Sequence, residues 1–227
     1  MCDPQVTVTV FGHGRRECLD ATLASFDDNV DPALITARLI FDDSADADYQ
    51  NDLAACYPRW GIVGAATRAG FGGNIARAWR TLPGVSSCRF VFHLEEDFVF
   101  NQPVDLQGMI RVLDSHPYLA QLALLRQPWG PTEEAVGGFV AADRASFTNH
   151  TDGTHDWFEH RKFFTTNPSL YRLSLTRHGW PDGDHSEGVF THRLLADPDI
   201  RFGYWGRTED PPAVHHIGDS RTTGEGY

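Results

Sequence analysis

Short apolar runs alternate with helical patterns along the first half of the chain. Residues 6–11 (VTVTVF) are β-branched and apolar and predict a strand, and a helical pattern follows at 17–26. The same reasoning predicts strands at 39–41, 61–65 and 89–94, and helices at 48–57 and from 74 to 82. Strands that alternate with helices predict an α/β fold, in which a mainly parallel sheet is flanked by helices and ligands bind at the carboxyl ends of the strands.

The pattern is less regular in the second half. A helix is predicted at 106–116 and a strand at 119–125, and residues 126–168 are rich in Gly, Pro, Trp, His and charge, which is typical of loops and irregular strands around a site. Within this segment we expect a loop or acceptor-side element at 155–160. We then expect a strand or short helix at 170–176, a helix at 187–195, a strand at 201–204, a last apolar-flanked element at 214–218 and a mobile tail at 219–227.

The size of the chain fits one folded unit. Its 227 residues, 12% of them aromatic, are enough for one substantial core and few for two independent ones, so we expect a single domain over 1–227. No stretch approaches the roughly 20 apolar residues that cross a bilayer. The first residues, MCDP, lack the basic and apolar regions of a signal peptide. These features predict a cytoplasmic protein without a membrane span.

Charge and motifs narrow the classes of ligand. A formal net charge of −12 argues against broad electrostatic binding to a nucleic-acid backbone, which needs clustered Lys and Arg. Lys162 is the single lysine, and it does not lie in a P-loop motif. Gly12 and Gly14 do not complete a dinucleotide-binding fingerprint, because Glu17 stands at the third glycine position.

Three carboxylates follow directly on the buried strand 89–94. Glu95, Glu96 and Asp97 would repel one another at one strand end unless a cation neutralised them. Hard divalent cations such as Mn²⁺ or Mg²⁺ prefer oxygen ligands of this kind and bridge them to phosphates. A solvated acidic turn is the alternative interpretation of the same residues.

These elements resemble a known arrangement in their order and spacing. A strand ending in a small polar loop, a second ending in FDDS at 41–44, a glycine-rich segment at 68–74 and a strand closing on EED at 95–97 are similar to the nucleotide-binding half of inverting, family 2-like GT-A glycosyltransferases. The resemblance covers residues 1–100. It implies that residues 101–218 form the acceptor-binding and catalytic half.

The resemblance implies roles for individual residues. The segment Glu95-x-Asp97 takes the place of the metal-binding D-x-D motif, so Asp97 is the main expected ligand of Mn²⁺ or Mg²⁺ and Glu95 a further one. The expected donor-binding residues are Phe11, His13, Asp42, Asp43, Arg68, Gly72, Asn74, Glu95 and Glu96.

Two segments of the second half match the family more weakly. Residues 184–190 resemble the segment that carries the general base, which takes the acceptor proton in an inverting displacement. Glu187 is the expected base and Asp184 the reserve, since Gly188 replaces the second acid of the usual pair. Of His215 and His216, His216 is the better match to a histidine that completes the metal shell, and only one of two adjacent strand side chains can face the metal.

The expected function is therefore metal-dependent transfer of a sugar, hexosyl or pentosyl, from a nucleotide-sugar donor such as a UDP-sugar to an acceptor hydroxyl. The acceptor is a glycan, lipid or protein, or a hydroxylated base in phage DNA, and the sequence carries no motif that selects among them. A metal-dependent nucleotide-sugar hydrolase and a catalytically degenerate nucleotide-sugar-binding module remain alternatives.

Overall fold

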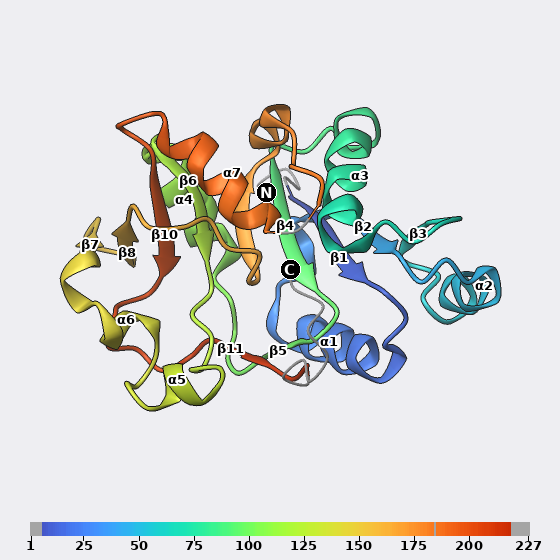
Figure 1. Ribbon diagram of the computed structural model, residues 1–227, viewed down its shortest axis with the longest axis horizontal. Helices are drawn as coiled ribbons and strands as arrows, with labels where there is room; N and C mark the ends of the chain where they lie inside the picture. Colours follow the sequence, from blue (N-terminus) through green and yellow to red (C-terminus); the bar gives the residue numbers. More distant parts are fainter. Residues whose placement is uncertain (1–5, 184, 219–227) are drawn as a thin grey trace.

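A nine-stranded mixed sheet organises the computed structural model, which describes residues 6–183 and 185–218 (Figure 1). Its strand order is β3-β2-β1-β4-β9-β6-β10-β8-β7. The first four are parallel neighbours, whereas β9 is antiparallel to both β4 and β6. The strands are β1 (Val6–Gly12), β2 (Ile35–Asp42), β3 (Gly61–Gly64), β4 (Phe90–Glu95), β6 (Leu119–Ala123), β7 (Thr148–Thr151), β8 (Asp156–His160), β9 (Ser169–Arg172) and β10 (Arg201–Trp205).

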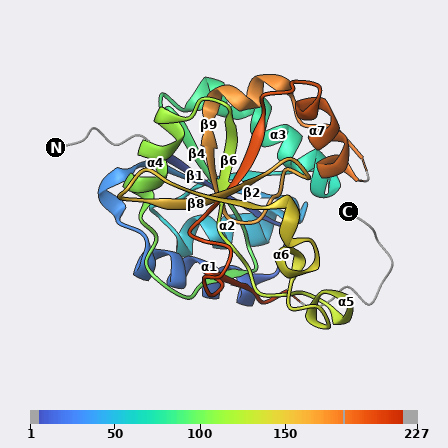
Figure 2. The same cartoon turned by 90° about the vertical axis from the view of Figure 1, so that its left-hand side faces the viewer.

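Helices cover both faces of this sheet, as the view from the β7–β8 end shows (Figure 2). Helices α1 (Arg16–Asn29), α2 (Ala47–Cys56) and α4 (Leu106–Ser115) contribute apolar side chains to one core, and α3 (Gly70–Val85) and α7 (Ser186–Leu195) contribute to the other. The short helices are α5 (Pro131–Glu134) and α6 (Phe139–Ala142), with 3₁₀ turns η1 (Pro32–Leu34), η2 (Arg144–Ser146) and η3 (Leu173–His178).

The two cores follow from the alternation of side chains along the strands. In β1, Val8 and Val10 face the α1 side, and Phe11 faces the α3 side. On the α1 side, Phe26 is fully buried among aromatic rings. On the α3 side, Trp79 packs edge-on against Phe190 at 5.0 Å between ring centroids. Both faces of β1 and β4 are buried, which explains their nearly continuous apolar runs.

A separate two-stranded ribbon lies beside the sheet. Strand β5 (Phe98–Phe100) follows β4 after a tight turn, and β11 (Val214–His216) pairs with it antiparallel. Figure 1 shows this ribbon next to α1. The pairing brings the last described strand of the chain back to the end of β4.

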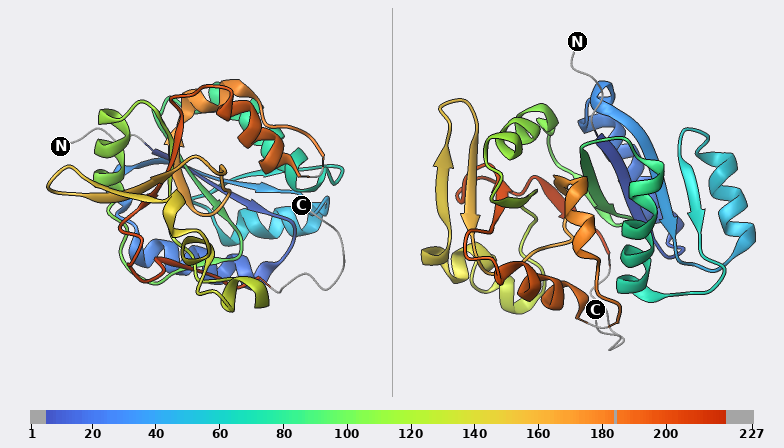
Figure 3. Two further views of the ribbon diagram at one scale, coloured as in Figure 1. Left: turned by 60° about the vertical axis from the view of Figure 1, so that its left-hand side comes forward. Right: turned by 90° about the horizontal axis from the view of Figure 1, so that it is seen from above.

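The fold confirms the predicted α/β class and corrects some of the expected elements. Residues 156–160, expected as a loop or acceptor-side element, form β8 inside the main sheet because Phe158 packs into a small core on one face while Trp157 is buried on the other. The segment 170–176 is strand β9 followed by the 3₁₀ turn η3. Figure 3 shows the β7–β8 hairpin at one end of the sheet and β3 with α2 at the other.

Among the residues that the structure describes, no helix has the length and apolar character needed to span a membrane. The tail expected at 219–227 lies outside the described residues.

Phe26 gives a direct test of the α1-side core. Its side chain is fully buried and lies near Trp60, Phe92 and Phe100. We expect Phe26→Ala to lower the free energy of unfolding by about 3–5 kcal/mol, because it leaves a cavity. Val85→Ala, at a 59% exposed position, serves as the control and should change it by less than about 0.5 kcal/mol. Urea denaturation of both variants measures this, and equal effects would contradict the packing described.

Candidate active site

Strands β1, β2 and β4 end together at one edge of the sheet because they are parallel and in register. Gly12 pairs with Asp42 across β1 and β2, and Phe11 pairs with Glu95 across β1 and β4. The pairing continues past the strands, since the backbone N–H of Asp43 donates to the carbonyl of Gly12 at 2.8 Å. The polar residues that follow these strands are thereby brought to one place.

Glu96 is buried and fixes the loop that follows β1. Its Oε1 accepts hydrogen bonds from the backbone N–H of His13 at 3.2 Å and from Arg15 Nε at 2.8 Å, and it lies 2.5 Å from His13 Nδ1. A Cβ atom on Gly12 would lie 2.5 Å from Glu96 Oε2, so a larger residue here would push the Glu96 carboxylate out of its present position. The expected donor-binding residues His13 and Glu96 are thus bonded to each other.

Asp97 is the centre of the site. Its Oδ2 lies 2.7 Å from Arg15 NH2 and 3.1 Å from His216 Nε2, while its Oδ1 is buried without a hydrogen-bond partner among the described residues. Burial alone would raise the pKa of Asp97. The hydrogen bonds and charges of His216 and Arg15 outweigh burial and hold that pKa below its usual range. Asp97 is therefore a carboxylate with one oxygen held and one oxygen free to bind a cation.

His216 reaches Asp97 through the β5–β11 ribbon. It pairs with Phe98 in the ribbon register, and the N–H of Ile217 donates to the carbonyl of Asp97 at 2.8 Å. Its side chain is 7% exposed, whereas the neighbouring His215 is exposed. Of the two adjacent histidines, the structure brings His216 to the carboxylates.

A glutamine and a tryptophan fix the position of His216. Gln127 clamps its backbone: the His216 N–H donates to Gln127 Oε1 at 2.9 Å, and Gln127 Nε2 donates to the His216 carbonyl at 3.0 Å. The Trp129 ring packs edge-on against the imidazole, with 4.4 Å between centroids. His216 Nδ1 is buried without a partner among the described residues. The imidazole is held in place by its backbone and by packing.

Glu95 and Glu187 are the other two acids of the site. Glu187 lies in the first turn of α7, and its Oε1 accepts from the backbone N–H of Thr166 at 2.7 Å and from the Thr166 hydroxyl at 3.0 Å. Burial raises the pKa of Glu187. Burial also raises the pKa of Glu95, and the charges of Asp97 and Glu187 raise it further. Glu95 therefore lies within electrostatic reach of both acids.

The residues present fit a divalent cation that is shared with a ligand. Among residues 6–183 and 185–218, no three or more His, Cys, Asp or Glu side chains gather in a group that would hold a metal by themselves. Asp97 and His216 supply two ligand atoms in contact, with the unpartnered Asp97 Oδ1 beside them. Mg²⁺ and related ions are commonly held by one or two protein groups, with phosphate oxygens and water completing the shell.

The aspartates after β2 bind neighbouring loops. Asp42 Oδ2 accepts from Ser44 Oγ at 2.5 Å and from Gln50 Nε2 at 3.0 Å. Asp43 accepts from two backbone N–H groups just before and at the start of α3, those of Ala69 and Gly70, at 2.8–3.0 Å. Both carboxylates are buried. They shape the loops around the predicted donor site.

The remaining predicted donor residues occupy different environments. Asn74 Nδ2 donates to the carbonyl of Phe41 at 2.9 Å, which ties α3 to the strand ends. Phe11 is buried and stacks on His93 at 4.4 Å. A Cβ atom on Gly72 would lie 2.9 Å from the Gly183 carbonyl. Arg68 is exposed. Asp184, the reserve base, lies outside the described residues.

Sequence reasoning missed three residues of this site. Arg15 bonds two of the three acids, Gln127 clamps His216, and Thr166 holds Glu187. For Arg15 the sequence offered one indication of a role in the site, namely its position directly after the loop Gly12-His13-Gly14. Gln127 and Thr166 lie in the irregular segment 126–168, where no spacing pattern points to them.

Neither the protein-family models nor the curated proteins contain a match to this sequence. Solved structures do match the fold. The mannosyltransferase PcManGT from Pyrobaculum calidifontis, in complex with GDP-Man and Mn²⁺, superposes with a TM-score of 0.65 at 15% identity, over 98% of this chain and 59% of that one.

Two further structures agree. TarS 1-349 from S. aureus in complex with UDP-GlcNAc gives a TM-score of 0.64 at 15% identity over 96% of this chain, and GalNAc-T7 with UDP, GalNAc and Mn²⁺ gives 0.64 at 8% identity over 94%. This chain spans 59% of the TarS chain and 43% of the GalNAc-T7 chain. The chain thus has the GT-A glycosyltransferase fold, a central mixed sheet flanked by helices.

Glu187→Gln tests the burial of that acid through stability. A raised pKa means that ionised Glu187 opposes folding: its favourable contribution is present below its unfolded pKa, about 4.3, and is lost as the pH rises through the folded value. Glutamine keeps the acceptor for Thr166 and carries no charge. We therefore expect Glu187→Gln to be more stable than the wild type at pH 7 in chelator, and the gain to disappear near pH 4.

Urea denaturation at both pH values measures this gain. Glu17→Gln is the matched control, because Glu17 is also an acid in the first turn of a helix but is exposed. It should show no gain at pH 7. A Glu187→Gln protein that is less stable than the wild type at pH 7 would contradict the burial described.

Proposed function

We propose that this chain is a metal-dependent, inverting glycosyltransferase that moves a hexosyl or pentosyl group from a nucleotide-sugar donor to an acceptor hydroxyl. The observation that carries the proposal is the contact of Asp97 with His216 at the end of β4 of a GT-A fold. Glu95, beside them, interacts electrostatically with both Asp97 and Glu187. The fold neighbours solved with UDP-GlcNAc, with GDP-Man and Mn²⁺, and with UDP, GalNAc and Mn²⁺ support it.

Asp97 and His216 would hold the cation, with Glu95 as a further candidate ligand. Bound there, Mn²⁺ or Mg²⁺ offsets the negative charge that builds on the leaving nucleoside diphosphate. Arg15 keeps Asp97 Oδ2 in place, which leaves Oδ1 to face the ion. Asp42, Asp43, Asn74, Phe11, His13, Arg68, Gly72 and Glu96 would form or support the walls of the donor site, with a UDP-sugar as the first donor to test.

Glu187 is the proposed general base. Both hydrogen bonds from Thr166 go to Oε1, which leaves Oε2 to take the proton from the attacking hydroxyl. A carboxylate with a raised pKa is the stronger base, because it binds the proton more tightly. Attack on the face opposite the leaving group inverts the anomeric centre. Asp184 is the reserve for this role.

The acceptor is proposed only as a class. A glycan hydroxyl or a hydroxylated nucleobase in DNA fits the chemistry, and the net charge of −12 favours the glycan because it repels a phosphate backbone. Product analysis with and without acceptors separates transfer from hydrolysis of the donor.

Donor binding should require the metal. An unneutralised diphosphate next to Asp97 and Glu95 is unfavourable, so we expect UDP affinity to fall at least about ten-fold when Mn²⁺ is replaced by excess chelator. Asp97→Asn should abolish this Mn²⁺ dependence together with transfer, whereas Asp114→Asn, at a carboxylate paired with Arg89 outside the site, should leave both intact. Calorimetry measures UDP binding, and equal affinity with and without Mn²⁺ would refute the metal assignment.

Glu187→Gln should separate binding from chemistry. The amide keeps the shape and the bonds from Thr166 but cannot take a proton, so we expect unchanged UDP affinity and a turnover lowered by about 10² or more. Glu17→Gln again serves as the control and should keep normal turnover. The products of the wild type should carry an inverted anomeric centre by NMR. Near-normal transfer by Glu187→Gln would move the base to Asp184 or another acid.

A further inference from the structure

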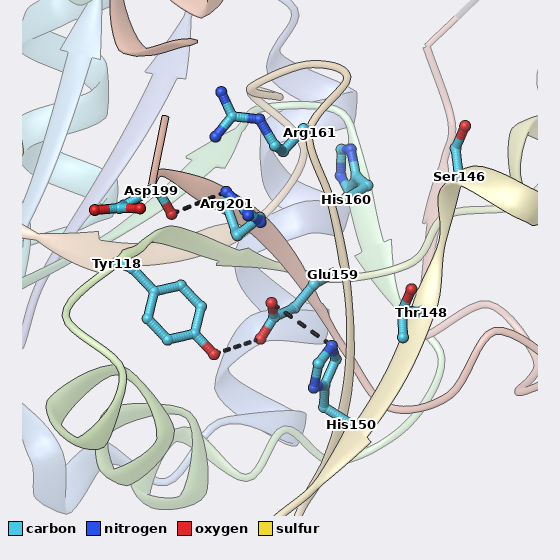
Figure 4. A pocket seen from close by; sticks show the side chains of 9 residues that line it. All are labelled: Tyr118, Ser146, Thr148, His150, Glu159, His160, Arg161, Asp199 and Arg201. Atoms are coloured by element: carbon cyan, nitrogen blue, oxygen red, sulfur yellow. Dashed lines mark hydrogen bonds and ion pairs between the residues drawn. The ribbon is translucent and has the colours of Figure 1, made fainter. Parts of the chain in front are cut away.

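A cavity of about 720 Å³ lies outside the candidate active site (Figure 4). It lies where β6 and β10 begin and β8 ends, against Tyr118, Glu159 and Arg201. Because β6 and β10 run parallel to β4, their starts lie at the sheet edge opposite to Glu95 and Asp97. We call this cavity the β8 pocket. Its size is that of a small-molecule site, and it is separate from the proposed donor site.

Glu159 forms the polar centre of the β8 pocket. It is 7% exposed, and its Oε1 accepts from Trp157 Nε1 at 2.7 Å and from the Tyr118 hydroxyl at 3.0 Å. Its Oε2 lies 3.6 Å from His150 Nε2, which is too long for a good hydrogen bond. One carboxylate oxygen is thus fixed by two neutral donors, and the other is left to accept a hydrogen bond from a ligand.

The two histidines of the pocket lie on opposite faces of the β7–β8 hairpin, because His150 shares a face with Glu159 whereas the His160 ring packs against Phe147 and Tyr204. The His150 ring stacks on Trp157 at 5.8 Å between centroids with an interplanar angle of 16°, and the His150 side chain is 37% exposed. His160 is 3% exposed, and its Nδ1 accepts from the backbone N–H of Lys162 at 3.2 Å. The neutral ring therefore carries its proton on Nε2, and that atom is buried without a partner among the described residues.

The charges around the pocket cancel. Glu159 and Asp199 offset Arg161 and Arg201. Both guanidinium groups already donate to backbone carbonyls, for example Arg201 to that of Pro198 at 2.8 Å and Arg161 to that of Ile200 at 2.9 Å. They do not form an open fork for a phosphate. This balance favours a neutral ligand with many hydroxyl groups over an anion or a cation.

We propose that the β8 pocket binds a neutral carbohydrate. This glycan segment is held by hydrogen bonds to Glu159 and by packing on the flat face of the His150 ring. The hydroxyl groups of such a ligand donate to Glu159 Oε2 and accept from an N–H of the His150 ring. The choice of a carbohydrate over other neutral polar molecules rests on the proposed sugar-transfer function. The location at the opposite sheet edge makes this a second sugar site rather than part of the donor site.

Binding of neutral trisaccharides tests this proposal. Saturation-transfer NMR and calorimetry on the full chain would use maltotriose, mannotriose and the β-1,4-linked trimer of N-acetylglucosamine. We expect at least one to bind the wild type and to bind Glu159→Gln about ten-fold more weakly. Thr148→Trp, which adds a large ring at an exposed position lining the pocket, should block it. Val85→Trp, at an exposed site on α3, should bind normally.

The outcomes separate this proposal from the proposed function. Unchanged sugar binding by both Glu159→Gln and Thr148→Trp, or loss of binding in Asp97→Asn, would overturn the pocket assignment. So would the failure of all three sugars to bind at about 10 mM, or displacement of the bound sugar by inorganic phosphate. UDP binding with Mn²⁺, measured on the same variants, should be unaffected by Thr148→Trp. Sugar binding at the pocket without any nucleotide binding would refute the transferase while keeping this site.

Discussion

An arginine and a histidine side chain meet at one buried oxygen of Asp97. Arg15 lies at 2.7 Å and His216 at 3.1 Å from Asp97 Oδ2, and Arg15 also bonds Glu96. Three consecutive acids cannot all be buried at a strand end without such compensation. The loop after β1, the turn after β4 and the β5–β11 ribbon are therefore fixed relative to one another by these side-chain contacts. The rest of the candidate site is built around this arrangement.

The remaining acids are left undercompensated, which suits a site that awaits a ligand. Burial raises the pKa of both Glu95 and Glu187, and no cation lies as close to them as Arg15 does to Asp97 among the contacts described. Folded proteins tolerate such groups mainly where function requires them. A ligand that binds only the folded chain at this place would return part of the stability that the site gives up.

The sequence allowed the α/β class, most element positions and the crowding of acids after β4 to be predicted, because these depend on local periodicity and on the register of parallel strands. The strand β8 was not predicted, because Trp, His and Phe in a segment rich in Gly and Pro do not reveal which of them face a core. Arg15, Gln127 and Thr166 were also missed, since each acts on a residue 21 to 89 positions away. Contacts of that kind depend on tertiary structure.

The β5–β11 pairing also bears on how the protein is made. Chains fold as they emerge, N-terminal parts first. Strands β1 and β4, the loop with Arg15 and the acids of 95–97 are complete long before His216 leaves the ribosome. During that interval Asp97 can contact Arg15 but not yet His216, so only one of its two side-chain partners has been synthesised. The contact between Asp97 and His216 therefore forms only after the strands that carry the acids have been made, and a chain without β11 would keep those acids but lack this contact.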